Sequence, residues 1–281
     1  MITLHTYTMG KLDIIVRILE VIFTCISFSL VASVGHSTDS FWTCCMFTWC
    51  FCFSLTLCRL CMEFPSLRET LPDFCNDFAA ACAMLSTLMV LAASIIYPIF
   101  FTCPSCGRQI GATVTSCLAF ILHAIEVCLM KAEKNSRFLY TVPGFLKILE
   151  TFVACIIFFC LDYTSISRFP GLQWCVAVYS ICSIFTFLVI ISTICQLLSA
   201  CPEAVGQNKV LTVCNALAVL MYITAVVIWP LYSFKNNPRP SYCSKVVTCP
   251  WNNLVVISFM TCVNLIAYIV DTVYSFRLVF S

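Results

Sequence analysis

The chain has 281 residues, of which 61% are hydrophobic and only 10% are charged. Soluble domains are nearer half apolar and a quarter charged, so this composition indicates a protein embedded in a lipid bilayer. The net charge of +2 provides neither a basic surface for nucleic acid nor an acidic tail. Most of the 23 cysteines lie inside apolar runs, which excludes the disulfide framework of a small secreted domain.

Eight apolar stretches are long enough to cross a membrane, because a helix needs about 20 residues to span roughly 30 Å of hydrocarbon. Backbone groups must bond internally in lipid, and the alternation typical of barrel strands is absent, so each stretch is predicted to be a helix. The sequence therefore predicts an all-α integral membrane protein with eight spans: Ile14–Val34, Phe41–Cys61, Phe78–Phe101, Ile110–Met130, Phe145–Tyr163, Trp174–Leu198, Val210–Ser233 and Asn253–Ser275.

Charge and aromatic residues predict an orientation in which both ends of the chain lie in the cytosol. Ten of the 15 lysines and arginines then lie in or beside cytosolic segments, and five lie on the opposite side. Pro98 and Pro230 are expected to end their helices near the outer face. The aromatic residues at the predicted outer ends of the spans are expected to form an interfacial belt: Trp42, Tyr97, Trp174, Trp229 and Trp251.

The second half of the chain repeats motifs of the first half in the same helix order. RILE at 17–20, followed by CI at 25–26, reappears as KILE at 147–150, followed by CI at 155–156. The pattern AxxIYP at 93–98 reappears as AxxIWP at 225–230, and a Cys nine residues before an acid occurs in spans four and eight. We infer a duplicated four-helix unit. Because each unit crosses the membrane four times, the two units have the same orientation and form a parallel repeat.

Several charged residues fall within the predicted spans, where they are costly and therefore mark candidate sites. Glu20 and Glu150 lie roughly 9 Å inside the cytosolic ends of spans one and five. The acids of spans four and eight lie at similar depth, which predicts that spans one and four adjoin, as do five and eight. The full set is Arg17, Glu20, His123, Glu126, Lys147, Glu150 and Asp271.

Two interpretations of this set remain open. In the first, it forms a structural polar clasp that fixes helix packing, with Arg17 and Lys147 each compensating the Glu three residues later. In the second, it forms a proton or cation site in which His123 completes a relay. We favour the clasp, because the acids lie near the membrane rim and spans two, three and six offer almost no polar groups for a conduction path.

The longest outer loop contains Cys243 and Cys249, and we predict a disulfide between them in an oxidising compartment. Cys103 and Cys106 also face outward, as a short disulfide or as two idle thiols. The sequence contains no catalytic motif, no phosphate-binding loop and no metal-ligand spacing among its three histidines. We therefore expect no enzyme activity, no cofactor and no metal.

Several stretches closely resemble the myeloid-associated differentiation marker family. They are SFSLVASVG (27–35), MFTWCFCF (46–53), ASIIYP (93–98), TVPG (141–144), LETFVACII (149–157), WCVAVY (174–179) and WPLY (229–232). The resemblance covers nearly the whole chain. It implies two tandem MARVEL domains of four helices, which we expect at residues 10–137 and 142–279. Cys103, Cys106 and the short segment before the first span depart from the family pattern and indicate a divergent paralogue.

The resemblance also implies a role without chemistry. Such proteins are associated with raft-like, cholesterol-rich membrane, with vesicle traffic and with the cortical cytoskeleton, at the plasma membrane and its vesicles. The expected partners are membrane lipids, with self-association or protein partners in the bilayer and no nucleic acid. The alternative from a different class is a small transporter or channel that uses the inner-leaflet acids Glu20, Glu126, Glu150 and Asp271.

The predicted orientation has a direct test. Because the charge bias places both ends in the cytosol, epitope tags at either terminus should be reached by antibody only after the cells are permeabilised. Staining of a terminal tag on intact cells would contradict it.

Overall fold

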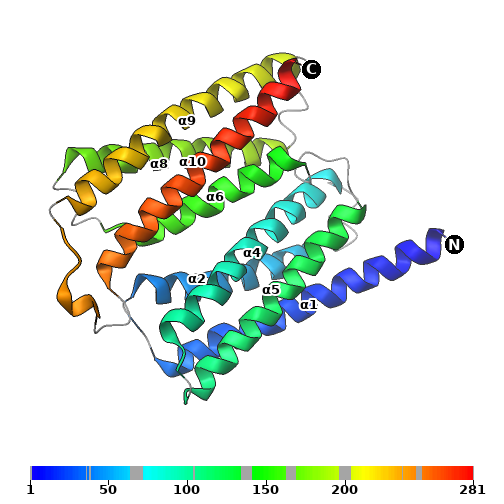
Figure 1. The fold of residues 1–281 in the computed structure, drawn as a ribbon. Helices are drawn as coiled ribbons and strands as arrows, with labels where there is room; N and C mark the ends of the chain where they lie inside the picture. The colour runs from blue at the N-terminus through cyan, green and yellow to red at the C-terminus, as the bar shows by residue number, and fades with distance from the viewer. Residues whose placement is uncertain are drawn as a thin grey trace. The chain divides into compact units, whose positions relative to one another are not determined.

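A computed structural model describes residues 2–35, 37, 39–63, 72–103, 105–133, 141–162, 169–195, 204–235, 237–244 and 249–280. Every regular element in these ranges is helical (Figure 1). Eight helices are long and apolar enough to cross a membrane, which confirms the predicted fold class of a multi-pass, all-α membrane protein. The chain divides into two compact units, residues 1–140 and 141–281. The narrower domain limits predicted above and the orientation in the membrane stay predictions.

The first unit contains α1 (Ile2–Val34), α2 (Ser40–Met62), α4 (Pro72–Phe101) and α5 (Gly107–Glu133). Each helix packs against the next along the chain, and α5 packs back against α1, so the four helices form a closed ring. The second unit repeats this arrangement with α6 (Val142–Cys160), α8 (Pro170–Ile194), α9 (Ala204–Phe234) and α10 (Pro250–Phe280). A short 3-10 helix, η2 (Ser241–Ser244), lies between α9 and α10.

The helix ends follow from local sequence. The Asp39 carboxylate caps α2 by accepting hydrogen bonds from the backbone N–H groups of Phe41 and Trp42, at 2.8 and 3.4 Å. Proline occupies the first helical residue of α8 and α10, where its missing N–H costs nothing. Gly35 follows α1 with φ of +120°, in a region that residues with a Cβ rarely adopt.

Some helix limits differ from those predicted. The first helix begins at Ile2 rather than Ile14, although its apolar span begins only at Leu12. Helix α6 stops at Cys160 and α8 at Ile194, before the ends predicted for the fifth and sixth spans, and those predicted ends, Tyr163 and Leu198, lie outside the described residues. Pro98 and Pro230 lie inside their helices, which continue for three and four residues. A proline so near a helix end removes one backbone bond without ending the helix.

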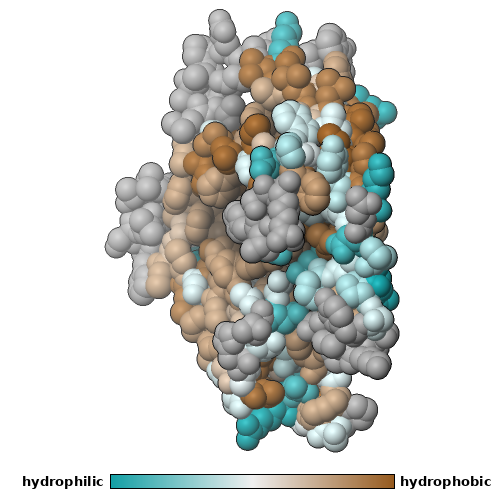
Figure 2. All heavy atoms as spheres, turned by 90° about the vertical axis from the view of Figure 1, so that its left-hand side faces the viewer, coloured by the Kyte–Doolittle hydropathy of each residue, from teal (hydrophilic) through white to brown (hydrophobic). Residues whose placement is uncertain are grey.

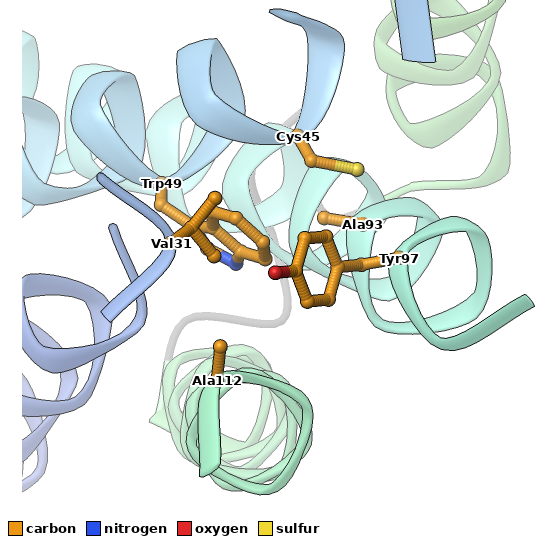
Figure 3. Packing of buried hydrophobic residues seen from close by; sticks show 6 residues of the cluster. All are labelled: Val31, Cys45, Trp49, Ala93, Tyr97 and Ala112. Carbon is orange, nitrogen blue, oxygen red and sulfur yellow. The ribbon is translucent and has the colours of Figure 1, made fainter. Parts of the chain in front are cut away.

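The interior of the first unit is built around two aromatic rings. Trp49 of α2 and Tyr97 of α4 meet edge to face with ring centroids 5.3 Å apart. Figure 3 shows both rings between the helices, with Val31 and Ala112 facing them. The indole N–H of Trp49 donates to Ser116 Oγ at 2.9 Å. This bond satisfies the one polar atom that the ring buries.

Two of the five aromatics expected in an interfacial belt lie inside the bundles instead. Tyr97 and Trp229 are each 1% exposed, whereas Trp174 is exposed. Apolar side chains form most of the outer surface, including Ile99, Leu220 and Val227, and they cover a broad area of the face in Figure 2. Water-soluble proteins rarely expose so large an apolar surface, so these side chains are suited to contact lipid in a bilayer.

Replacement of Trp49 tests this packing. Trp49→Ala should lower the thermal unfolding midpoint of the purified protein strongly, because truncating a buried Trp costs about 3–5 kcal/mol in protein cores. Phe47→Ala on the same helix is the matched control, since that ring is 43% exposed, and its effect should be much smaller. Equal losses from both variants would contradict the assignment of Trp49 to the core.

Candidate functional site: two buried polar clusters

The first polar cluster joins three helices of the first unit and comprises Arg17, Glu20, Arg59, His123 and Glu126. All five residues are at most 3% exposed. Arg17 Nε donates to Glu126 Oε1 at 2.7 Å, and Arg59 Nη1 donates to Glu126 Oε2 at 2.5 Å. Each oxygen of Glu126 therefore receives its own guanidinium group. Such charge-assisted bonds are roughly twice as strong as neutral ones.

Glu20 is compensated from α2 rather than from its own helix. Arg59 Nη2 donates to Glu20 Oε2 at 3.0 Å, and the hydroxyl of Thr56 lies 3.4 Å from the same oxygen. Arg17 uses its remaining nitrogens on Glu63 and Asp13, at 2.5 and 2.8 Å. Arg17 thus links the buried cluster to two acids that are partly exposed at its edge.

His123 completes the cluster beside Glu20, with Nδ1 3.2 Å from Glu20 Oε1. Ligand atoms of Glu20, His123 and Glu126 lie within 4.8 Å of one another, a spacing compatible with a metal ion. The two carboxylates are already bonded to guanidinium groups, whose positive charges oppose a second cation at short range. The arrangement is therefore that of an ion-pair network rather than of a metal centre.

The second polar cluster comprises Lys147, Glu150, Thr186, Asn215 and Asp271, which are at most 4% exposed and come from all four helices of the second unit. The Lys147 ammonium lies 3.0 Å from Glu150 Oε2 and 2.8 Å from Asp271 Oδ2, and it donates to Asn215 Oδ1 at 2.8 Å. Asn215 Nδ2 donates to Asp271 Oδ2 at 2.7 Å. The Lys147 ammonium group therefore links α6, α9 and α10.

The two clusters occupy equivalent positions of the duplicated unit. Thr56 approaches Glu20, and Thr186 donates in the same way to Glu150 at 3.0 Å. The core bond also repeats, because Tyr179 in the position of Trp49 bonds to Thr261 in the position of Ser116, at 2.8 Å. Residues 130 positions apart match in the first two helices of each unit: Arg17 with Lys147, Glu20 with Glu150, Trp49 with Tyr179, and Thr56 with Thr186.

Comparison with known proteins agrees with this duplication. The model of the MARVEL family, a membrane-associating domain, matches the chain twice, at residues 9–129 and 138–274. A Xenopus laevis myeloid-associated differentiation marker homolog is 41% identical over 95% of this chain and 92% of its own length. The human myeloid-associated differentiation marker is 40% identical over 95% of this chain and 88% of its own length.

The chain belongs to the myeloid-associated differentiation marker family. A related Xenopus laevis protein, myeloid-associated differentiation marker-like protein 2, is 38% identical over 94% of this chain and 91% of its own length. No solved structure matches the chain. The two MARVEL matches fall one in each compact unit, so each unit of this family member is one membrane-associating domain.

In this member of the myeloid-associated differentiation marker family, the structure brings all seven sequence-predicted charged residues into the two clusters. It also places α1 against α5 and α6 against α10, as the matched depths of the acids predicted. One expected pairing differs, because Arg17 bonds to Glu126 and not to Glu20. Lys147 does pair with Glu150 three residues later.

Three residues of the clusters are absent from the sequence-predicted set: Arg59, Thr186 and Asn215. The sequence places Arg59 only among the cytosolic flanking charges, although it is buried and bonds to both acids of the first cluster. Thr186 and Asn215 lie within the sixth and seventh predicted spans. A search for every polar residue inside a predicted span finds all three, since such residues are costly in lipid.

The cysteines of the two loops predicted to lie outside are bonded in pairs. Cys243 and Cys249 form a disulfide with Cα atoms 5.3 Å apart, between η2 and the start of α10. Cys103 and Cys106 form a second disulfide with Cα atoms 5.2 Å apart, just before α5. Both separations lie in the usual range for a disulfide. These bridges tie the connections between the third and fourth helices of each unit.

The second cluster predicts unequal effects of removing its base and one of its acids. Lys147→Leu should lower the yield of folded protein more than Glu150→Gln, because it removes the cation that contacts both acids, and an uncompensated charge in the membrane costs about 2.5–3.5 kcal/mol. The double variant should recover part of the loss. Recovery of monodisperse protein after detergent purification measures the yield. Equal losses from the single changes, with no recovery in the double, would argue against the clasp.

Proposed function

We propose that this protein is a non-enzymatic organiser of raft-like lipid domains, located in the plasma membrane and its vesicles, where it links ordered lipid to vesicle traffic or to the cortical cytoskeleton. Its partners in this role are sterol-rich lipids and other membrane proteins, including further copies of itself. Membership of a family built from membrane-associating domains supports the proposal. The proposal includes a structural role for the two polar clusters, as clasps that fix the packing of the helices in each bundle.

The observation that carries this proposal is the pairing of the buried charges. Arg17, Arg59, Glu126 and Lys147 each bond to an opposite charge within their own bundle, at exposures of 0–3%. Ion conduction needs polar groups that exchange partners with water along a path. A cluster whose charged groups are paired with those of neighbouring helices instead stabilises one arrangement of the bundle.

The length of the spans supports an ordered-lipid environment. Seven of the eight candidate spans contain 23 or more residues. A helix of that length extends roughly 34 Å at 1.5 Å per residue, which matches the thickness of about 32–33 Å of a sterol-rich plasma membrane. Spans of this length are energetically better matched to thick bilayers than to thin ones.

This match predicts where the protein partitions. In giant vesicles drawn from the plasma membrane and cooled until two phases separate, a fluorescent fusion should be enriched in the ordered phase. As a control, the protein is reconstituted into two phase-separating lipid mixtures. In one mixture the two phases differ in thickness, and in the other they do not. Enrichment in the ordered phase should occur only in the mixture whose phases differ in thickness. Uniform distribution, or enrichment in the disordered phase, would contradict the proposed role.

The transporter alternative makes a distinct prediction. Proteoliposomes of the wild-type protein would carry protons or cations faster than protein-free liposomes, and Glu20→Gln would abolish the flux. We expect no flux above the protein-free rate, because Glu20 is held by Arg59. Flux that depends on Glu20 would replace the organising role with transport.

A further inference from the structure

The second polar cluster contains one acid more than it has bases. Among the described residues, Lys147 is the only cation that pairs with Glu150 and Asp271. Both carboxyl groups are at most 1% exposed. A carboxylate held at depth costs about 2.5–3.5 kcal/mol on insertion scales unless a partner compensates it. One ammonium leaves one negative charge of the pair uncompensated.

Among its fully buried groups, the first cluster has as many bases as acids. There, two guanidinium groups face two fully buried carboxylates, because Arg59 contacts both Glu20 and Glu126. Arg59 stands three residues after Thr56, and the equivalent position three residues after Thr186 is Val189. The second unit has therefore kept the two acids, the hydroxyl and one base of the shared framework, but has an aliphatic side chain where the second base stood.

The bonding of the two acids distinguishes them. Asp271 Oδ2 accepts from both the Lys147 ammonium and the Asn215 amide, at 2.8 and 2.7 Å. Glu150 Oε2 accepts from Lys147 and from the Thr186 hydroxyl, each at 3.0 Å. Glu150 Oε1 is buried and has no hydrogen-bond partner among the described residues. A proton can occupy this oxygen without displacing an existing bond.

We propose that Glu150 is a proton-binding site of the second bundle, and that its carboxyl group carries a proton on Oε1 while Asp271 pairs with Lys147. Binding of the proton brings the net charge of the cluster to zero. The site goes beyond the organising role and does not depend on it.

Residues of all four helices of the second unit surround Glu150. The titratable or polar groups near Glu150 are Lys147 on its own helix, Cys182 and Thr186 on α8, Asn215 and Tyr222 on α9, and Tyr268, Asp271 and Ser275 on α10.

Infrared spectroscopy of the purified full-length protein tests the site directly. At neutral pH the wild type should show the C=O stretch of one protonated carboxyl group per chain. Glutamate labelled with carbon-13 at its side-chain carboxyl, introduced by cell-free synthesis, should shift this band, and labelled aspartate should not. Glu150→Gln should remove the band. The matched control is Glu20→Gln at the equivalent position of the first unit, which should retain the band. If Glu20→Gln fails to fold, Glu63→Gln at the edge of the first cluster replaces it as the control.

Several outcomes would overturn the proposal. A wild-type spectrum without the band would show that both acids are ionised, and a band shifted by labelled aspartate would place the proton on Asp271. A band that persists in Glu150→Gln would belong to another residue.

Discussion

A carboxylate within a membrane span is tolerated only where another part of the protein supplies a compensating charge or donor. In both bundles, that requirement decides which helices adjoin. Glu126 on α5 is reached by bases from α1 and α2, and Asp271 on α10 is reached by a base from α6 and an amide from α9. Apolar packing between helices gains little from lipid exclusion alone, since lipid tails are equally apolar. The polar contacts therefore specify which helices meet, and the aromatic rings fill the space between them.

The duplicated unit shows which parts of this arrangement tolerate change. Glu150 and the hydroxyl of Thr186 repeat the pair of Glu20 and Thr56. The aromatic ring that bonds across the core changes from Trp49 to Tyr179, and the hydroxyl that it contacts changes from Ser116 to Thr261. In each case a donor still reaches a hydroxyl oxygen, so the bond is kept although the side chains differ. The charges are less constrained, because the second unit relies on an ammonium and an amide where the first uses two guanidinium groups. Arginine can bind two carboxylates with its planar fork, whereas lysine acts as a point charge.

The sequence predicted the eight spans, the duplication and the adjacency of the acid-bearing helices, because each depends on features that are local or periodic. Apolar run length sets the spans, and matched depths of the acids set the pairing of helices. It did not predict that Arg59 turns inward, because an arginine at the end of a span can equally extend to the headgroups. The interior position of Tyr97 and Trp229 was missed for a similar reason, since an amphipathic ring suits both the interface and a hydrogen-bonded core. Such choices depend on tertiary neighbours that a single sequence does not display.

The closed ring of helices has a consequence for biogenesis. Helices enter the bilayer in chain order, and the contact between α1 and α5 forms only when the last helix of the first unit has been inserted. Until then Arg17 and Arg59 lack Glu126, the acid that binds both of them, and their partners are acids of α1 and of the end of α2. In the second unit, α6 brings Lys147 and Glu150 together on one helix, and Asp271 arrives last with α10. The first domain therefore depends on its fourth helix for the acid that joins its two arginines, whereas the second contains a paired base and acid from its first helix onward.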